Sequence, residues 1–323
     1  MAGATRVEPR RLALAPGDDT RLAARRVLAF HLGTFEREQP AARGGDVEAV
    51  HQLRVATRRL RATLNLFAPI LPAAAVGSAT EGLRTIGRAI GAVRDLDVLA
   101  MANSTRGRRL PDESRAALGP LEHAIVERRT VALAELGRVL DAAQSRRLLV
   151  RLNRLAASPP GARSPVRLGD SAGNLLRPLL RAVQRAGRDL DEETPAVALH
   201  RARVRVKRLR YACETLESLA GDDLRGVIRR LVRLQDALGE HQDAVMQASW
   251  LRAYAGPAQL PPATLLAMGA IVDALERRAG KLRRRAARAW RRFDKGRVRR
   301  ALLDVVRRFG TPPARTTRTR ARA

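Results

Sequence analysis

The stretch VHQLRVATRRLR, residues 50–61, separates basic and apolar side chains onto two sides of a predicted helix. At about 100° per residue, its basic members fall within an arc of roughly 80°. Leu53 and Leu60, continued by Leu64 and Phe67, fall on the opposite side and predict a stripe that faces a core. The basic face consists of His51, Arg54, Arg58 and Arg61.

The pattern returns in the second half of the chain as LHRARVRVKRLR, residues 199–210. The two histidines lie 200 − 51 = 149 positions apart. Further along, Gly91 and Asp95 correspond to Gly239 and Asp243 at an offset of 239 − 91 = 148. Two matches in the same order, at nearly one offset, indicate an internal duplication. We therefore predict two helical bundles related by a pseudo-twofold axis. The second basic face consists of His200, Arg203, Lys207 and Arg210.

Apolar residues recur at spacings of three and four along almost the whole chain, which predicts an all-α protein. Ser, Pro and Gly gather at 158–165 near the midpoint and indicate a linker. The predicted parts are an N-terminal arm (1–17), a first bundle (18–157), a linker (158–167), a second bundle (168–309) and a disordered basic tail (310–323).

Local signals set the expected helix limits. Thr20, Asp46 and Thr194 are predicted N-caps, because their side-chain oxygens can accept a backbone N–H. We expect one continuous helix at about 112–157. A break at Gly280 is expected to separate two further helices, at about 262–279 and 281–308.

Two aspartates, Asp95 and Asp243, follow a glycine at what we expect to be a helix break. There each would cap a helix or form an ion pair that orients an arginine of the basic face. The same aspartates could join His51 and His200 in a metal site. The neighbouring arginines would repel a cation, and the two histidines do not share one helix at ligand spacing. We expect neither a metal site nor catalytic acid–base chemistry.

The charge of the chain limits its partners. The 323 residues carry 62 Lys and Arg against 32 Asp and Glu, a formal charge of +30 with a pI near 11.8. This balance favours a polyanion: nucleic acid, an anionic membrane or polymeric phosphate. Neither basic face has an acid to relieve repulsion, since no Asp or Glu occurs between residues 49 and 80 or between 194 and 213. Arginine forks suit phosphate oxygens, and four over about 15 Å of helix would form a track for an extended polyanion.

The two motif pairs resemble a known family. HxxRVxxRRLR from His51, followed by GxxRDxDV from Gly91, is similar to the conserved-histidine α-helical domain, or CHAD, family. HxxRxxxKRLRY from His200, followed by LGxxxDA from Leu238, resembles its other repeat. The likeness extends from about Leu12 to Phe309.

The resemblance implies two four-helix bundles around a basic central cavity that binds inorganic polyphosphate. The residues of the two basic faces would then be the ligands. Some family members also carry an enzymatic triphosphate-tunnel domain with an ExExK strand. That motif does not occur in this sequence, and we therefore expect a chain that is not an enzyme and holds no cofactor.

Other arginines are candidates for the same site. Arg59 and Arg208 flank the two basic faces. The run from Arg277 to Arg300 is the most basic segment, and from it we add Arg284, Arg288 and Arg291 to the polyphosphate-binding set. We interpret Trp290 and Phe293 in this run, and Tyr211 after the second motif, as packing residues. The run could equally serve as a nucleic-acid or membrane-surface element.

Three alternatives to polyphosphate binding stay open. One is weak, non-specific binding of nucleic acid, although aromatics make up only 3% of the chain and base-stacking modules need them. The others are an enzyme that acts on phosphate polymers and a structural helical protein with solvated faces. The N-terminus lacks an apolar signal region, and the single Cys213 excludes an intrachain disulfide. We expect a cytoplasmic protein without a membrane span, with polyphosphate granules as a candidate place of attachment.

Overall fold

The structure is a computed structural model that describes residues 12–108, 111–158, 165–257, 259–294 and 297–309. Within these ranges the chain forms helices and no strand, which confirms the predicted all-α class. Leu53, Leu60 and Leu64 of the predicted core stripe are buried at 0% exposure, and so is Leu209 in the second motif. Burial of these apolar stripes is what holds each amphipathic helix in place.

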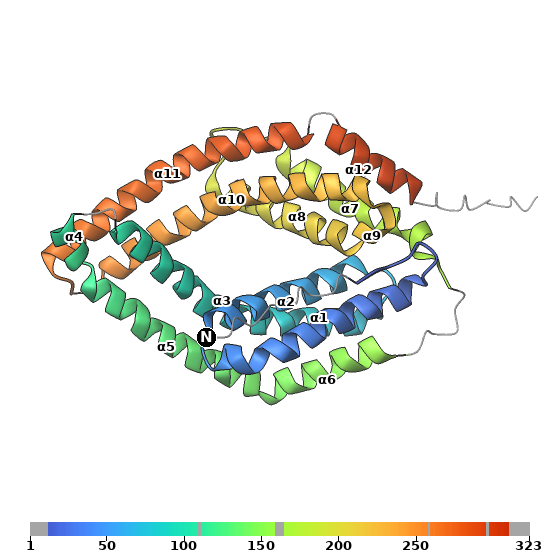
Figure 1. Ribbon diagram of the computed structural model, residues 1–323, viewed down its shortest axis with the longest axis horizontal. Helices are drawn as coiled ribbons and strands as arrows, with labels where there is room; N and C mark the ends of the chain where they lie inside the picture. Colours follow the sequence, from blue (N-terminus) through green and yellow to red (C-terminus); the bar gives the residue numbers. More distant parts are fainter. Residues whose placement is uncertain (1–11, 109–110, 159–164, 258, 295–296, 310–323) are drawn as a thin grey trace, which may run out of the picture.

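The first half of the chain contributes the helices along the bottom of Figure 1. Helix α1 packs on α2, α2 packs on α3 and α3 packs on α5, while α6 returns to cover α1 and α3. The bounds are α1 (Thr20–Arg43), α2 (Val47–Leu66), α3 (Ala73–Gly107), α4 (Asp112–Ala116), α5 (Gly119–Asp141) and α6 (Ala143–Ala157).

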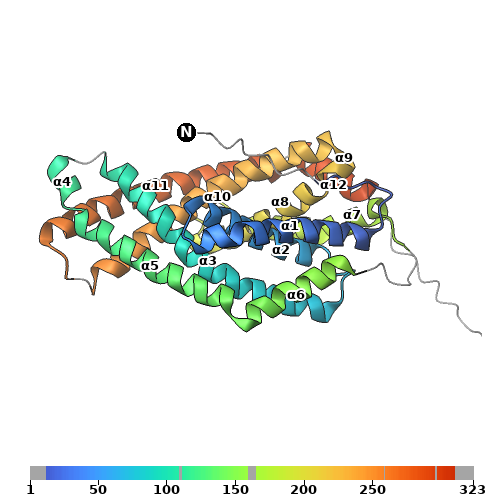
Figure 2. The same cartoon turned by 60° about the horizontal axis from the view of Figure 1, so that its bottom comes forward.

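The second half contributes the upper helices of Figure 1 in the same order of neighbours. Helix α7 packs on α8, α8 on α10 and α10 on α11, while α12 returns to α7 and α10. Figure 2 shows the long pairs α3–α5 and α10–α11 converging near α4. The bounds are α7 (Leu168–Gly187), α8 (Ala196–Thr215), α9 (Glu217–Ala220), α10 (Asp222–Ala255), α11 (Pro262–Asp294) and α12 (Arg297–Arg308). The pseudo-twofold axis and the domain limits stay predictions.

The two halves meet at two places along the molecule. Helix α2 packs against α8, and a continuous core of buried residues runs through both halves. A second apolar cluster joins the ends of α3, α5, α10 and α11, with Leu121, Met268 and Leu275 at its centre. The basic faces of α2 and α8 are therefore held in a fixed relation to each other.

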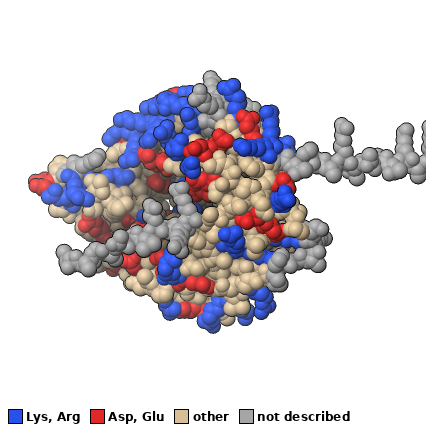
Figure 3. All heavy atoms as spheres, turned by 45° about the vertical axis from the view of Figure 1, so that its right-hand side comes forward, with Lys and Arg blue, Asp and Glu red and all other residues tan. Residues whose placement is uncertain are grey.

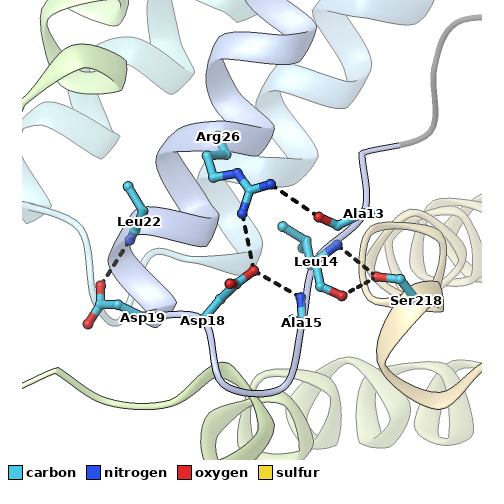
Figure 4. A network of polar contacts seen from close by, with 8 residues as sticks. All are labelled: Ala13, Leu14, Ala15, Asp18, Asp19, Leu22, Arg26 and Ser218. Carbon is cyan, nitrogen blue, oxygen red and sulfur yellow. Dashed lines mark hydrogen bonds and ion pairs between the residues drawn. The ribbon is translucent and has the colours of Figure 1, made fainter.

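The described part of the N-terminal arm also ties the halves together (Figure 4). Leu14 exchanges two backbone hydrogen bonds with the hydroxyl of Ser218, and its side chain is 4% exposed. Arg26 of α1 donates to the carbonyl of Ala13 and to the carboxylate of Asp18. The rest of the arm (1–11), residues 159–164 of the linker and the tail (310–323) lie outside the described residues.

Two of the three predicted N-caps are wrong. Asp46 caps α2 as expected, because its carboxylate accepts from the backbone N–H of Ala49. Helix α1 is capped by Asp19 rather than Thr20, since Asp19 accepts from two backbone N–H groups of the first turn. Thr194 does not cap α8, because its hydroxyl bonds back to Asp191 and Asp189.

Two expected helix limits are also wrong. The segment 112–157 forms three helices, and α5 ends at Ala142 with an extended ψ of 138°. Ser145 donates to the carbonyl of Val139 there, which satisfies an end of α5 that no glycine or proline marks. Gly280 lies inside the continuous α11, where burial of the apolar residues on either side outweighs its cost of about 1 kcal/mol.

Asp95 and Asp243 likewise lie inside unbroken helices, α3 and α10, and neither is at a break. Trp290, Phe293 and Tyr211 are buried, as their interpretation as packing residues requires. The ring of Trp290 lies against Gly187 of α7, where any Cβ would overlap it. None of the described helices is long and apolar enough to cross a membrane.

Candidate functional site

Both basic faces lie where α2 and α8 approach each other, and most of their side chains are half-buried. His51, Arg54, Arg58 and Arg61 of α2 are all partly covered. On α8, Arg203, Lys207 and Arg210 are partly covered, whereas His200 and Arg208 are exposed. These faces are therefore not ordinary solvated surfaces, because arginine and lysine are rarely enclosed without a partner.

The charges of the two faces act on one another across the α2–α8 contact. Burial lowers the pKa of Lys207 to about 7, assisted by the arginines around it on both helices. Burial also lowers the pKa of Arg58, to which Arg54, Arg203 and Arg210 contribute. We call the five mutually interacting cations Arg54, Arg58, Arg203, Lys207 and Arg210 the central cluster. A bound anion would relieve this repulsion and favour the charged form of each member.

The two halves place one arginine of the central cluster in the same way. Arg54 of α2 pairs with Asp95 of α3 at 3.3 Å, and Arg203 of α8 pairs with Asp243 of α10 at 3.8 Å. This confirms the expectation that the two aspartates form ion pairs with arginines of the basic faces.

Glycines make room for both guanidinium groups. A Cβ at Gly91 would lie 2.6 Å from Nη1 of Arg54, and one at Gly239 would lie 3.4 Å from Nη2 of Arg203. The glycine of each motif therefore serves close approach of an arginine to the next helix, rather than a turn.

Some donors of the central cluster have no acceptor. The Nε atoms of Arg58 and Arg203 are enclosed, and neither has a hydrogen-bond partner among the described residues. A buried donor without an acceptor costs roughly 1–3 kcal/mol. Phosphate oxygens are suitable acceptors for such groups, because guanidinium donates charge-assisted hydrogen bonds to them. The donor set therefore fits an anion with several oxygens.

The two histidines lie beside polar partners of the long helices. Burial, assisted by the charge of Arg94, lowers the pKa of His51, which favours its neutral form. His200 lies with Nδ1 3.1 Å from Oε1 of Gln242. Neutral imidazole can still donate one N–H to a phosphate oxygen. Among the described residues, no group of three or more His, Cys, Asp and Glu is placed to hold a metal ion.

Arg59 and Arg210 have an acidic partner that the sequence did not suggest. Glu214 at the end of α8 forms ion pairs with Arg210, at 2.9 Å, and with Arg59 of α2, at 3.2 Å. Both guanidinium groups also lie over the ring of Tyr211, 5.7 and 4.8 Å from its centroid. We call Arg59, Arg210, Glu214 and Tyr211 the Glu214 junction. It joins the two halves, and its arginines are only partly free for a ligand.

Arg61 and Arg208 form a contrasting pair at the same helix contact. Burial lowers the pKa of Arg61, and the charges of Arg84 and Arg208 lower it further. Partial desolvation of its otherwise exposed side chain and the charge of Arg205 lower the pKa of Arg208. The Nε of Arg61 is enclosed without an acceptor among the described residues. These two arginines therefore extend the basic surface away from the central cluster.

The three candidates on α11 lie elsewhere. Arg288 and Arg291 line a depression with Arg230 of α10 and Arg292. Arg284 is exposed on α11. Figure 3 shows Lys and Arg side chains gathered along the top of the molecule, where α11 runs. The structure places Arg288 and Arg291 beside α10 and not at the contact between α2 and α8. It does not support the expectation that they share one cavity with the residues of the two basic faces.

Sequence reasoning missed three residues of the site. Arg94 acts on the charge of His51 and lies 3.9 Å from the carboxylate of the buried Asp97. Gln242 contacts His200, and Gln235 accepts from the Nε of Arg210 at 2.9 Å. Arg94 and Gln242 are separated by 242 − 94 = 148 positions, the offset of the second repeat match, which would have revealed both.

Comparison with known proteins adds a family relationship. The family model of the CHAD domain matches residues 26–252. An uncharacterized protein of Mycobacterium tuberculosis (MT2285) is 30% identical over 275 residues, which cover 81% of this chain and 51% of that protein. The chain thus spans about half the length of the curated relatives it matches.

Two solved structures have a similar fold. The CHAD domain from the plant Ricinus communis gives a TM-score of 0.73 at 24% identity, over 89% of this chain and 96% of that chain. PptA from Streptomyces chartreusis gives a TM-score of 0.70 at 20% identity, over 85% and 100% of the respective chains. The family match includes both basic helices, α2 and α8, and extends over more than half of the sequence. The chain belongs to the CHAD domain family.

Proposed function

We propose that the chain binds inorganic polyphosphate, without enzymatic activity, through the central cluster and the histidines beside it. The observation that carries the proposal is the convergence of two basic faces, from α2 and α8, into one group of cations that act on each other. Two enclosed arginine donors there, the Nε atoms of Arg58 and Arg203, lack acceptors among the described residues. Every unit of polyphosphate carries negatively charged oxygens, which accept hydrogen bonds from guanidinium groups and also neutralise their positive charge.

Binding would be driven mainly by electrostatics. Each cation that contacts a phosphate releases a condensed counterion, so affinity should fall steeply as salt rises, as it does for nucleic acids. The half-buried position of the cluster favours a narrow, flexible polyanion over a rigid duplex. A nucleic-acid duplex carries its phosphates on the outside of a wide helix, and reaching enclosed arginines would require the protein to open.

The test is calorimetric titration of long-chain polyphosphate at about 150 mM salt, where surface electrostatics are screened within roughly 8 Å. The variant R54A/R58A/R203A/K207A removes four cations of the central cluster. We expect it to lose at least a hundredfold in affinity, since two phosphate contacts of roughly 1.5 kcal/mol each already account for that factor.

The matched control is R37A/R115A/R138A/R252A, which removes four exposed arginines that pair with nearby acids on other faces. It changes the net charge equally and should keep most of the affinity. Equal losses in both variants would refute the central cluster as the site. Tighter binding of duplex DNA than of polyphosphate by the unchanged protein would favour the nucleic-acid alternative.

The proposed lack of catalysis rests on how the acids near the site are used. Asp95, Asp243 and Glu214 all pair with arginines, which ties up the carboxylates a hydrolytic mechanism would need. Incubation with polyphosphate and Mg²⁺ should therefore release no phosphate above background. Release that is abolished in R54A/R58A/R203A/K207A would overturn this part of the proposal. In cells, we propose that the same contacts attach the chain to polyphosphate granules.

A further inference from the structure

A second group of arginines surrounds a depression between α10 and α11. Its volume is about 560 Å³, and it is lined by Arg230, Arg288, Arg291 and Arg292. Arg291 pairs with Glu192 at 3.4 Å. The other three form no ion pair within the described part of the chain, and all three are exposed. A concave surface lined only by arginines is an unusual arrangement, because like charges in close proximity repel.

In the neighbouring part of the contact between α10 and α11, the exposed arginines are paired with an acid. There Glu240 of α10 accepts from Arg285 at 3.1 Å and lies 3.6 Å from Arg278, both on α11. One acid thus offsets two arginines. No acid lines the depression itself. The contact between α10 and α11 therefore differs along its length, with paired arginines around Glu240 and unpaired arginines at the depression.

The depression and the central cluster lie on different sides of α10. Gly239 lies directly under the guanidinium of Arg203, so it marks the side of α10 that faces the central cluster. Arg230 precedes Gly239 by nine residues, which at 100° per residue places it about 180° around the helix. The two arginine groups are therefore separated by the thickness of the helix, about 10 Å, and by about 13.5 Å along its axis.

We propose that Arg230, Arg288 and Arg292 form a second contact for a long phosphate polymer, on the outer side of α10. This inference rests on the proposed function, because the polymer is the one bound by the central cluster. A chain long enough to pass around α10 would engage both sites at once. Linking two contacts through one ligand raises the affinity without any change at either site. A short phosphate chain would fill only one site and gain nothing.

The experiment compares tripolyphosphate with long-chain polyphosphate on the full-length protein and on R230A/R288A/R292A. The triple variant should bind long chains at least about tenfold more weakly, the lower end of what linked contacts provide. Its affinity for tripolyphosphate at the central cluster should stay within about twofold. For long chains, the magnitude of the slope of log affinity against log salt should decrease by roughly two. Each phosphate contact contributes about 0.7 to this slope in single-stranded nucleic acids, and the variant removes three contacts.

R115A/R138A/R252A is the charge-matched control, since it removes three exposed arginines from α4, α5 and the far end of α10. It should leave both the long-chain affinity and the salt slope nearly unchanged. Long-chain losses that are equal in the two triple variants would overturn the outer contact while leaving the proposed function intact. If neither ligand binds the unchanged protein, the proposed function itself fails, and the outer contact fails with it.

Discussion

Two pairs of arginines at the α2–α8 contact occupy corresponding positions but have different surroundings. Arg59 and Arg210 share Glu214 and lie over Tyr211. Their counterparts in the repeat are Arg208 and Arg61, at 208 − 59 = 149 and 210 − 61 = 149. The position that corresponds to Glu214 is 214 − 149 = 65, an asparagine whose amide donates to the carbonyl of Arg61.

The presence or absence of a carboxylate at this position therefore distinguishes the two pairs of arginines. Where the carboxylate is present, the two guanidinium groups join the halves of the molecule. Where an amide replaces it, burial and like charge lower the pKa of Arg61, and its Nε has no acceptor among the described residues. We infer that the first pair mainly contributes stability and that the second pair is left for the ligand.

The largest effect is expected from breaking the Glu214 junction. In E214Q, Arg59 and Arg210 lose their counter-charge while staying partly covered. Removing one partner of a fully buried pair costs roughly 3–5 kcal/mol. Because the side chain of Arg59 is 38% exposed, we expect a loss of about 2 kcal/mol in the free energy of unfolding. Chemical denaturation measures it.

The control for E214Q is E135Q, which breaks the exposed pair between Glu135 and Arg138. Such pairs contribute about 0–1 kcal/mol. If the two variants are destabilised equally, Glu214 does not join the halves. Polyphosphate affinity should stay the same or rise slightly in E214Q, because two arginines are released.

The reverse exchange, N65E, should reduce binding rather than stability. A carboxylate at position 65 would lie one turn from Arg61 and within reach of Arg208, as Glu214 does for the other pair. If about 2 kcal/mol of phosphate contact is lost, affinity for polyphosphate should fall about thirtyfold. Titration calorimetry measures this change. N65A, which removes the amide without adding charge, is the control, and an equal loss in N65A would argue against the comparison.

Sequence alone came close to the fold and to the centre of the site. The alternation of Leu53 and Leu60 with Arg54 and Arg61 indicated both the buried and the basic side of α2, because helical periodicity fixes the two together. The repeat correctly paired Arg54 with Arg203, and the structure gives these arginines matching acidic partners.

What sequence could not provide were contacts between residues far apart in the chain. Glu214 lies just beyond the second motif, and nothing local indicates that its partner is Arg59 on another helix. Gly91 suggested a break, because glycine is read as a breaker unless the approaching side chain is known. Arg288 belongs to a segment as rich in arginine as the two motifs, but it lines a depression elsewhere on the molecule. Similar charge patterns therefore did not predict a shared location.

Lys207 makes binding depend on pH near neutrality. Burial lowers its pKa to about 7, with help from Arg203, Arg58, Arg54 and Arg210, while Asp243 of α10 acts in the opposite direction. A bound polyanion would raise this pKa, so binding takes up a proton above pH 7. Affinity is then highest below about pH 7, where Lys207 is already charged, and falls as pH rises. The linkage of one proton allows at most about a tenfold decrease between pH 6 and 8.

Stability should follow the opposite trend. The unfolded chain holds the Lys207 proton up to its usual pKa of about 10.4, whereas the folded chain releases it near 7, so stability rises with pH between these values. Calorimetry in buffers of different ionisation enthalpy measures the proton uptake on binding. In K207R the cation cannot lose its proton, and both pH dependences should flatten. An unchanged pH profile in K207R would assign the effect to another titratable group of the site, such as His51.

The smallest effect is expected at the two motif glycines, and it distinguishes the halves at their most similar point. G91A places a Cβ 2.6 Å from the guanidinium of Arg54, which must move, whereas G239A meets Arg203 at 3.4 Å and needs little adjustment. Both changes lie inside helices, where alanine is favoured over glycine by about 1 kcal/mol. Both variants should therefore be at least as stable as the parent, because the displaced atoms belong to the flexible end of a side chain.

Binding, however, should separate the two glycine variants. In G91A the displaced Arg54 loses its place beside Asp95 and the other members of the central cluster. Polyphosphate affinity should then fall about threefold, which is roughly half the value of one charge-assisted contact. In G239A it should stay within experimental error. Equal affinities in the two variants would mean that the position of Arg54 against α3 does not matter for the ligand. Gly91 would then have to be explained by helix packing alone.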